Sequence, residues 1–98
     1  RFAANRGLVY ALNYGFGIAQ GEYIARMDAD DISFPRRLEK QIEFMERNPE
    51  VGVCGTSILI KYTRQRYKIH IPYPTTHEKI RISLRLHSNF VCHPTTVI

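Results

Sequence analysis

Residues 22–39 read Glu-Tyr-Ile-Ala-Arg-Met-Asp-Ala-Asp-Asp-Ile-Ser-Phe-Pro-Arg-Arg-Leu-Glu. A short apolar run over residues 23–27 predicts a strand, and the run ends in three acidic residues, Asp28, Asp30 and Asp31. Carboxylates crowded at the end of a buried strand repel one another and are costly to desolvate. A bound cation relieves both costs, and oxygen ligands of this kind suit Mg²⁺ or Mn²⁺, which often bind together with a phosphate. The stretch therefore predicts a cation site.

Helical patterns flank this stretch on both sides. Apolar residues at spacings of three and four predict a helix over residues 6–19, with Asn5 as its N-cap. After the acidic residues, Ser33 can cap a second helix, which Asn48-Pro49 ends.

The second helix is expected to be amphipathic. Its apolar face is expected to contain Leu38, Ile42 and Met45, while its charged residues, Arg37 among them, face solvent. Buried and solvated faces on one helix indicate that it packs against a sheet or another helix.

The rest of the chain predicts further strands and one more helix. Residues 51–62, 67–71 and 90–98 are rich in β-prone residues, and Thr75 or Thr76 can cap a third helix. We therefore expect residues 1–98 to form a single α/β domain.

Length, charge and cysteine content set broad limits. The chain has 98 residues and a formal charge of +5, which favours anionic partners in general. Cys54 and Cys92 form no CxxC pair, so buried reduced thiols are expected. No apolar run approaches the roughly 20 residues that span a bilayer, and we expect a cytoplasmic protein. Arg1 in place of Met, and a strand-like run that stops at Ile98, predict a piece of a longer protein.

Two interpretations of the acidic cluster fit the sequence poorly. A calcium loop would use Asp28, Asp30 and Glu39 at its first, third and twelfth positions, but Ser33 stands where glycine is needed. A phosphatase-like nucleophile in an Asp-x-Asp pair would need Thr or Val where Ile32 stands.

Helix capping and a metal site both fit the cluster better. Helix capping explains Asp31 but leaves Asp28 and Asp30 unexplained. On an extended segment, Asp28 and Asp30 would point the same way and reach one ligand together. One carboxylate would then hold a metal, while the other touches a metal-bound water or the sugar part of a nucleotide. This pattern predicts a metal–diphosphate site.

About half of the chain, residues 5–55, resembles family 2 glycosyltransferases of the GT-A fold. The resemblance is carried by the order and spacing of Asn5-Arg6-Gly7-Leu8, Ala11-Leu12-Asn13, Gly15, Ala19, Gly21-Glu22-Tyr23-Ile24, Met27-Asp28-Ala29-Asp30-Asp31-Ile32-Ser33, Pro35, Arg37-Leu38, Gln41 and Asn48-Pro49. The segment Cys92-His93-Pro94-Thr95-Thr96 also resembles one found before the acceptor site in bacterial members.

The resemblance implies a fold and an activity. It implies a partial GT-A domain, a Rossmann-like α/β sandwich, here the central fragment of a catalytic domain. It also implies sugar transfer from a nucleotide-diphosphate sugar to an acceptor hydroxyl, with inversion and with Mg²⁺ or Mn²⁺. The family most often suggests bacterial cell-envelope polysaccharide synthesis, at the inner face of the membrane, on a glycan or lipid-linked acceptor.

The resemblance also implies site residues. Asp30 matches the metal ligand that bridges to the diphosphate. Asp28 matches a position that lies nearer the ribose or makes a second contact to the metal. Asn5 and Gly7 match the start of the helix before the metal strand, where a phosphate is favoured and packing is the alternative. His93 can approach the acceptor or be structural. No catalytic residue is assigned, because the general base is expected beyond residue 98, so the fragment alone is expected to be inactive.

A binding module without catalysis is the main rival to a transferase. The second half of the chain combines aromatic residues with the basic residues Lys61, Arg64, Arg66, Lys68, Lys79, Arg81 and Arg85. Such a surface can hold nucleic acid or an anionic lipid surface. We favour a solvated surface with no nucleic-acid partner, and leave peripheral membrane association and self-association open. A sugar-nucleotide pyrophosphorylase is a second enzymatic hypothesis, which the helix pattern disfavours.

Overall fold

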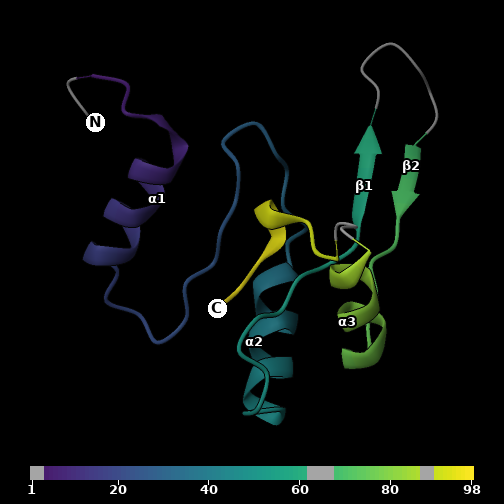
Figure 1. Ribbon diagram of the computed structural model, residues 1–98. Coiled ribbons are helices and arrows are strands. Elements are labelled where there is room, and N and C mark those ends of the chain that lie inside the picture. Colours follow the sequence, from purple (N-terminus) through teal and green to yellow (C-terminus); the bar gives the residue numbers. More distant parts are fainter. Residues whose placement is uncertain (1–3, 62–67, 87–89) are drawn as a thin grey trace.

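The computed structural model describes residues 4–61, 68–86 and 90–98 (Figure 1). In chain order the elements are α1 (Gly7–Ile18), α2 (Arg37–Arg47), β1 (Ile58–Lys61), β2 (Lys68–Ile71), α3 (His77–Arg85) and the 3₁₀ helix η1 (His93–Thr95). Helices thus flank short extended segments, which confirms the α/β class.

A small layer of three extended segments forms the centre. Val97 is fully buried and lies in the middle segment, bridged antiparallel to Ala25 on one side and to Cys54 on the other. The amide N–H groups of Val97 and Cys54 each donate to the other residue's carbonyl at 2.8 Å. The layer therefore joins residues that are more than 40 positions apart in the sequence.

The predicted strands around this layer were too long. Residues 23–27 contribute only the bridge at Ala25, and residues 90–98 form the η1 turn before the bridge at Val97. Pro94 carries no N–H for a sheet, and the amide of Thr95 donates instead to the carbonyl of Cys92 at 2.9 Å. The chain therefore turns where a straight strand was expected.

The two regular strands form a hairpin. β1 pairs antiparallel with β2, with Ile58 opposite Ile71 and Lys61 opposite Lys68. The predicted strand over residues 51–62 is thus reduced to the bridge at Cys54 and to β1. Residues 62–67, between the two strands, lie outside the described residues.

Helix α2 buries a face that agrees with the predicted one at Met45 but not at Leu38. Gln41 is 2% exposed and Met45 is 5% exposed, whereas Leu38 is 42% exposed. With Arg37, which is part-buried, these residues form a stripe at i, i+4 and i+8. The stripe faces the central layer because its polar side chains supply donors to backbone carbonyls there.

The helix ends agree with the sequence at two of four points. Asn48 follows the last residue of α2, and the Thr76 hydroxyl accepts from the N–H of Lys79 at 3.4 Å to cap α3. The predicted cap at Ser33 was wrong, since α2 begins at Arg37.

An ion pair stands at the start of α2 in place of a cap. The Arg36 guanidinium donates two hydrogen bonds to Glu39, at 2.8 and 2.9 Å. This pairing lowers the pKa of the Glu39 carboxyl below its ordinary value. Glu39 is therefore engaged by Arg36 and does not complete a calcium loop with Asp28 and Asp30.

Two further expectations concern thiols and membranes. Both cysteines are free, and both are only partly buried. Within the described ranges, no helix combines the length and the apolar character needed to cross a bilayer.

Helix α1 begins with an unusual turn. Gly7 has a φ of +82°, and its N–H donates to Asn5 Oδ1 at 2.9 Å. The N-cap position belongs to Arg6, so the prediction of Asn5 as N-cap was wrong, although Asn5 satisfies a free N–H one residue further on. Glycine is required here because the left-handed conformation is strained for other residues.

Gly7→Ala is expected to destabilise α1 by about 1 kcal/mol. Gly15→Ala is the matched control, since its Cβ would meet no atom within 4 Å and its φ is not left-handed. That control is expected to raise helix stability by about 0.5–1 kcal/mol. Thermal unfolding followed by circular dichroism compares the two, and effects of the same sign would contradict the left-handed turn.

Candidate functional site

The acidic residues lie in a turn. The amide N–H of Asp31 donates to the carbonyl of Asp28 at 3.2 Å, which closes residues 28–31 into a turn that we call the acidic turn. The side chains of Asp30 and Asp31 are exposed, and Asp28 is part-buried. The expectation that Asp28 and Asp30 lie on an extended segment was therefore wrong, although the turn still gathers both carboxylates within three residues.

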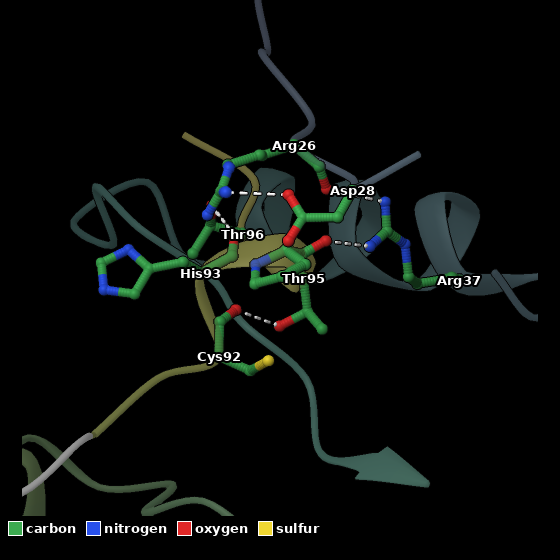
Figure 2. Close-up of polar contacts among 8 residues, drawn as sticks. Arg26, Asp28, Arg37, Cys92, His93, Thr95 and Thr96 are labelled. Carbon is green, nitrogen blue, oxygen red and sulfur yellow. Dashed lines mark hydrogen bonds and ion pairs between the residues drawn. The ribbon is translucent and has the colours of Figure 1, made fainter. Parts of the chain in front are cut away.

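Arg26 forms an ion pair with Asp28, as Figure 2 shows. The Arg26 Nη2 atom donates to Asp28 Oδ1 at 2.8 Å, and the two side chains are 16% and 41% exposed. From the sequence alone, Arg26 was given no part in the site. The signal that could have revealed it is the spacing, because residues two apart on an extended segment share a side.

The backbone ahead of the acidic turn is fixed from two directions. The N–H of Arg26 donates to the carbonyl of Thr96 at 2.8 Å. Arg37 Nη2 donates to the carbonyl of Arg26 at 3.2 Å, and Arg37 Nη1 donates to the carbonyl of Pro94 at 3.0 Å (Figure 2). One guanidinium at the start of α2 thus joins the segment before the acidic turn to η1.

Gln41, one turn further along α2, makes a second connection of this kind. Its Nε2 atom donates to the carbonyl of Cys54 at 3.0 Å and to the carbonyl of Thr95 at 2.8 Å. We call Arg37 and Gln41 the carbonyl clamp, because together they hold four backbone carbonyls from three segments. Both belong to the family pattern in the sequence, but their spacing of four residues on the stripe of Met45 was not recognised as a buried face.

Thr95 in η1 and Thr96 directly after it stabilise this turn through side-chain hydrogen bonds. Thr95 Oγ1 donates to the carbonyl of Cys92 at 2.8 Å and accepts from the N–H of Thr56 at 3.0 Å. Thr96 Oγ1 donates to the carbonyl of His93 at 2.9 Å. The His93 side chain is exposed and points away from the Arg26–Asp28 pair (Figure 2).

The structure does not connect all four predicted donor-site residues. Asp28 and Asp30 share the acidic turn, but among the described residues no hydrogen bond or ion pair links Asn5 or Gly7 to it. Figure 1 shows α1 to one side of α2, α3 and the hairpin. The contact between Asn5 and Gly7 explains both residues as parts of a local turn.

The carboxylates of the acidic turn suit a divalent cation that arrives with a phosphate. In the described part of the chain, no group of three or more His, Cys, Asp or Glu side chains could hold a metal ion. Asp30 is exposed and has no side-chain partner there. Magnesium-type ions are often held by only one or two carboxylates, with water and substrate phosphates completing the shell. The donor set therefore fits a metal–diphosphate better than a bare metal cage.

The chain is similar to members of one family of known proteins. The model of the family described as Glycosyl transferase family 2 matches residues 1–98. EpsE of Bacillus subtilis, a glycosyltransferase by name, is 50% identical over 56 residues, which is 57% of this chain and 20% of EpsE. The amylovoran biosynthesis glycosyltransferase AmsE of Erwinia amylovora is 47% identical over 55 residues, which is 56% of this chain and 21% of AmsE.

A third relative matches a longer part of the chain. The O-antigen biosynthesis glycosyltransferase WbnJ of Escherichia coli is 39% identical over 88 residues, covering 90% of this chain and 34% of WbnJ. The chain thus spans about a fifth to a third of the length of these relatives. No solved structure matches it.

Proposed function

The chain belongs to glycosyl transferase family 2, and from this premise we propose that it carries the donor-binding part of an inverting sugar transferase. The donor would be a nucleotide-diphosphate sugar and the acceptor a hydroxyl of a glycan or a lipid-linked glycan. Residues 1–98 would form a single domain unit, which is the central fragment of a larger catalytic domain. The general base would lie beyond residue 98, so that the fragment alone turns over no substrate.

The setting we propose is bacterial cell-envelope polysaccharide synthesis at the inner face of the membrane. Two relatives support it by name, since AmsE is named for amylovoran biosynthesis and WbnJ for O-antigen biosynthesis. The family match supports the transferase chemistry and leaves the sugar and the acceptor open.

The donor site is proposed at the acidic turn. The observation that carries it is the contrast between Asp28, held by Arg26, and Asp30, which is exposed with no side-chain partner in the described part of the chain. Asp30 would be the ligand of Mg²⁺ or Mn²⁺, and Asp28 would lie nearer the ribose or make a second contact to the metal. When bound, the metal would neutralise the diphosphate and stabilise it as a leaving group.

Other residues of the chain would orient this site. Arg26 would keep the Asp28 carboxylate in place, and Arg37 would hold the backbone ahead of the turn. Asn5 and Gly7 would contribute only by their place at the N-terminus of α1, a position that favours phosphate.

Asp30→Ala is expected to weaken metal-dependent UDP or GDP binding at least tenfold, because it removes the carboxylate proposed as the metal ligand. Calorimetric titration of the nucleotide into the chain, with Mn²⁺ and with chelator, measures this. Asp31→Ala is the matched control and is expected to change affinity less than threefold. Equal losses for the two variants would contradict the assignment of Asp30.

Binding of an anionic partner by a basic surface is a second candidate function, because of one observation. Lys61 and Lys68 lie opposite each other on β1 and β2, and both are exposed. In contrast, Arg81 is neutralised by Glu78 at 2.7 Å, and Arg64 and Arg66 lie outside the described residues. Steeply salt-dependent binding to single-stranded nucleic acid or anionic vesicles, unchanged by Asp30→Ala, would favour this candidate.

A further inference from the structure

We propose that Arg26 makes the acidic turn selective for a metal–diphosphate unit over the free metal ion, an inference that rests on the proposed function. The guanidinium is fixed beside the turn, because its side chain is only 16% exposed and is paired with Asp28 Oδ1 at 2.8 Å (Figure 2). Its backbone is held on both sides, by the carbonyl of Thr96 and by Arg37.

The charges of the site give Arg26 its effect. Three carboxylates lie within residues 28–31, and Arg26 reduces their formal charge from −3 to −2. A free divalent cation is repelled by the guanidinium and finds one oxygen of Asp28 already engaged. Arg26 therefore weakens the binding of the metal ion alone.

The same guanidinium acts in the opposite direction on a nucleotide diphosphate. A metal-bound nucleoside diphosphate keeps a net negative charge and would have to approach three carboxylates. A guanidinium carries five N–H donors, so Arg26 can hold Asp28 and still donate to a phosphate oxygen. Arg26 thus strengthens binding of the complex while it weakens binding of the ion.

This opposition separates a selective role from a structural one. If Arg26 only held the acidic turn in shape, its loss would weaken both ligands. If it selects the metal–diphosphate, its loss strengthens one ligand and weakens the other. The two affinities of one variant therefore decide between the roles without any measurement of sugar transfer.

The variant Arg26→Gln tests the proposal in the full chain. Binding of Mn²⁺ alone is followed by the electron paramagnetic resonance signal of the free ion, and binding of UDP at saturating Mn²⁺ by calorimetry. We expect Mn²⁺ alone to bind about fivefold tighter and UDP with Mn²⁺ about tenfold weaker. Arg26→Lys keeps the charge but has fewer donors, so Mn²⁺ alone is expected to bind within about threefold of the wild type and UDP with Mn²⁺ about fivefold weaker.

Arg81→Gln is the matched control, since it also removes a guanidinium that is paired with a carboxylate. It is expected to change neither affinity. Arg26→Lys carries the test if Arg26→Gln does not fold, because a structural role would weaken both ligands, whereas selection would weaken only UDP with Mn²⁺.

Several outcomes would overturn the proposal. Losses of affinity for both ligands in Arg26→Gln or in Arg26→Lys would leave Arg26 a structural role only. Unchanged affinities would remove Arg26 from the site. A folded wild-type chain that binds no UDP with Mn²⁺ would overturn the proposed function together with this inference, whereas the other outcomes would leave the proposed function standing.

Discussion

Gln41→Glu is expected to lower the free energy of unfolding by about 4 kcal/mol at neutral pH. Gln41 is 2% exposed, and its Nε2 atom donates to the carbonyls of Cys54 and Thr95 at 3.0 and 2.8 Å. The substitution places a carboxylate oxygen against two carbonyl oxygens in a buried position. Both hydrogen bonds are lost, and Arg37, the cation four residues earlier on the same stripe, already donates to the carbonyls of Arg26 and Pro94.

The deficit caused by Gln41→Glu is expected to shrink in acid. Burial and the two facing carbonyls raise the pKa of the new carboxyl in the folded state above its unfolded value. A raised pKa favours folding below the unfolded-state pKa, and this benefit is lost as pH rises through the folded-state pKa. The variant should therefore lie closer to the wild type below about pH 4 than at pH 7.

Urea unfolding at the two pH values measures both statements about Gln41. Gln20→Glu is the matched control, because the same substitution is made at an exposed position outside the helices. It is expected to change stability by less than about 0.5 kcal/mol. If Gln41→Glu behaved like this control, the carbonyl clamp would not be a main connection of the fold.

The sequence signals that succeeded were local. Apolar spacing predicted a helix over residues 6–19, and α1 spans Gly7–Ile18. Asn48 ends α2 and Thr76 caps α3, as expected. Each of these signals involves residues within one or two turns of one another. The predicted fold class, a partial GT-A α/β sandwich, is also confirmed by the match to the family over residues 1–98.

The signals that failed depend on distant partners. Residues 23–27 look like a strand, yet they form a single bridge, from Ala25 to Val97. Gln41 and Arg37 look solvated on a helical wheel, yet they face the layer because carbonyls far along the chain need donors. No pattern within α2 reveals where those carbonyls are.

In the candidate site, too, the local signal succeeded and the contacts between side chains were missed. The motif located Asp28 and Asp30, and the structure places both in the acidic turn. The extended segment expected for them was wrong, because the backbone turns after Asp28. Arg26 was overlooked because an arginine beside an apolar run is usually read as solvent-exposed, whereas here its side chain is 16% exposed and paired.

Gly55→Ala is expected to cost about 2–3 kcal/mol, because a Cβ at this position would overlap Val91 Cγ2. The valine side chain is short and stiff, so it cannot move aside as a long side chain would. The backbone cannot retreat either, since Cys54 is bridged to Val97 and the N–H of Thr56 donates to Thr95. The substitution therefore strains the contact between this segment and the end of the chain.

A double-mutant cycle with Val91→Ala tests this contact. Removing Cγ2 makes room for the new methyl group, so the two changes together should cost at least about 1 kcal/mol less than the sum of the single changes. Gly52→Ala is the matched control, since its Cβ would meet no atom within 4 Å, and it should show no coupling to Val91→Ala. Because Val91 leads into η1, and the carbonyl of Pro94 there accepts from Arg37, Gly55→Ala should also weaken metal-dependent UDP binding. Additive costs, or intact UDP binding in a destabilised Gly55→Ala chain, would show that the acidic turn is held independently of η1.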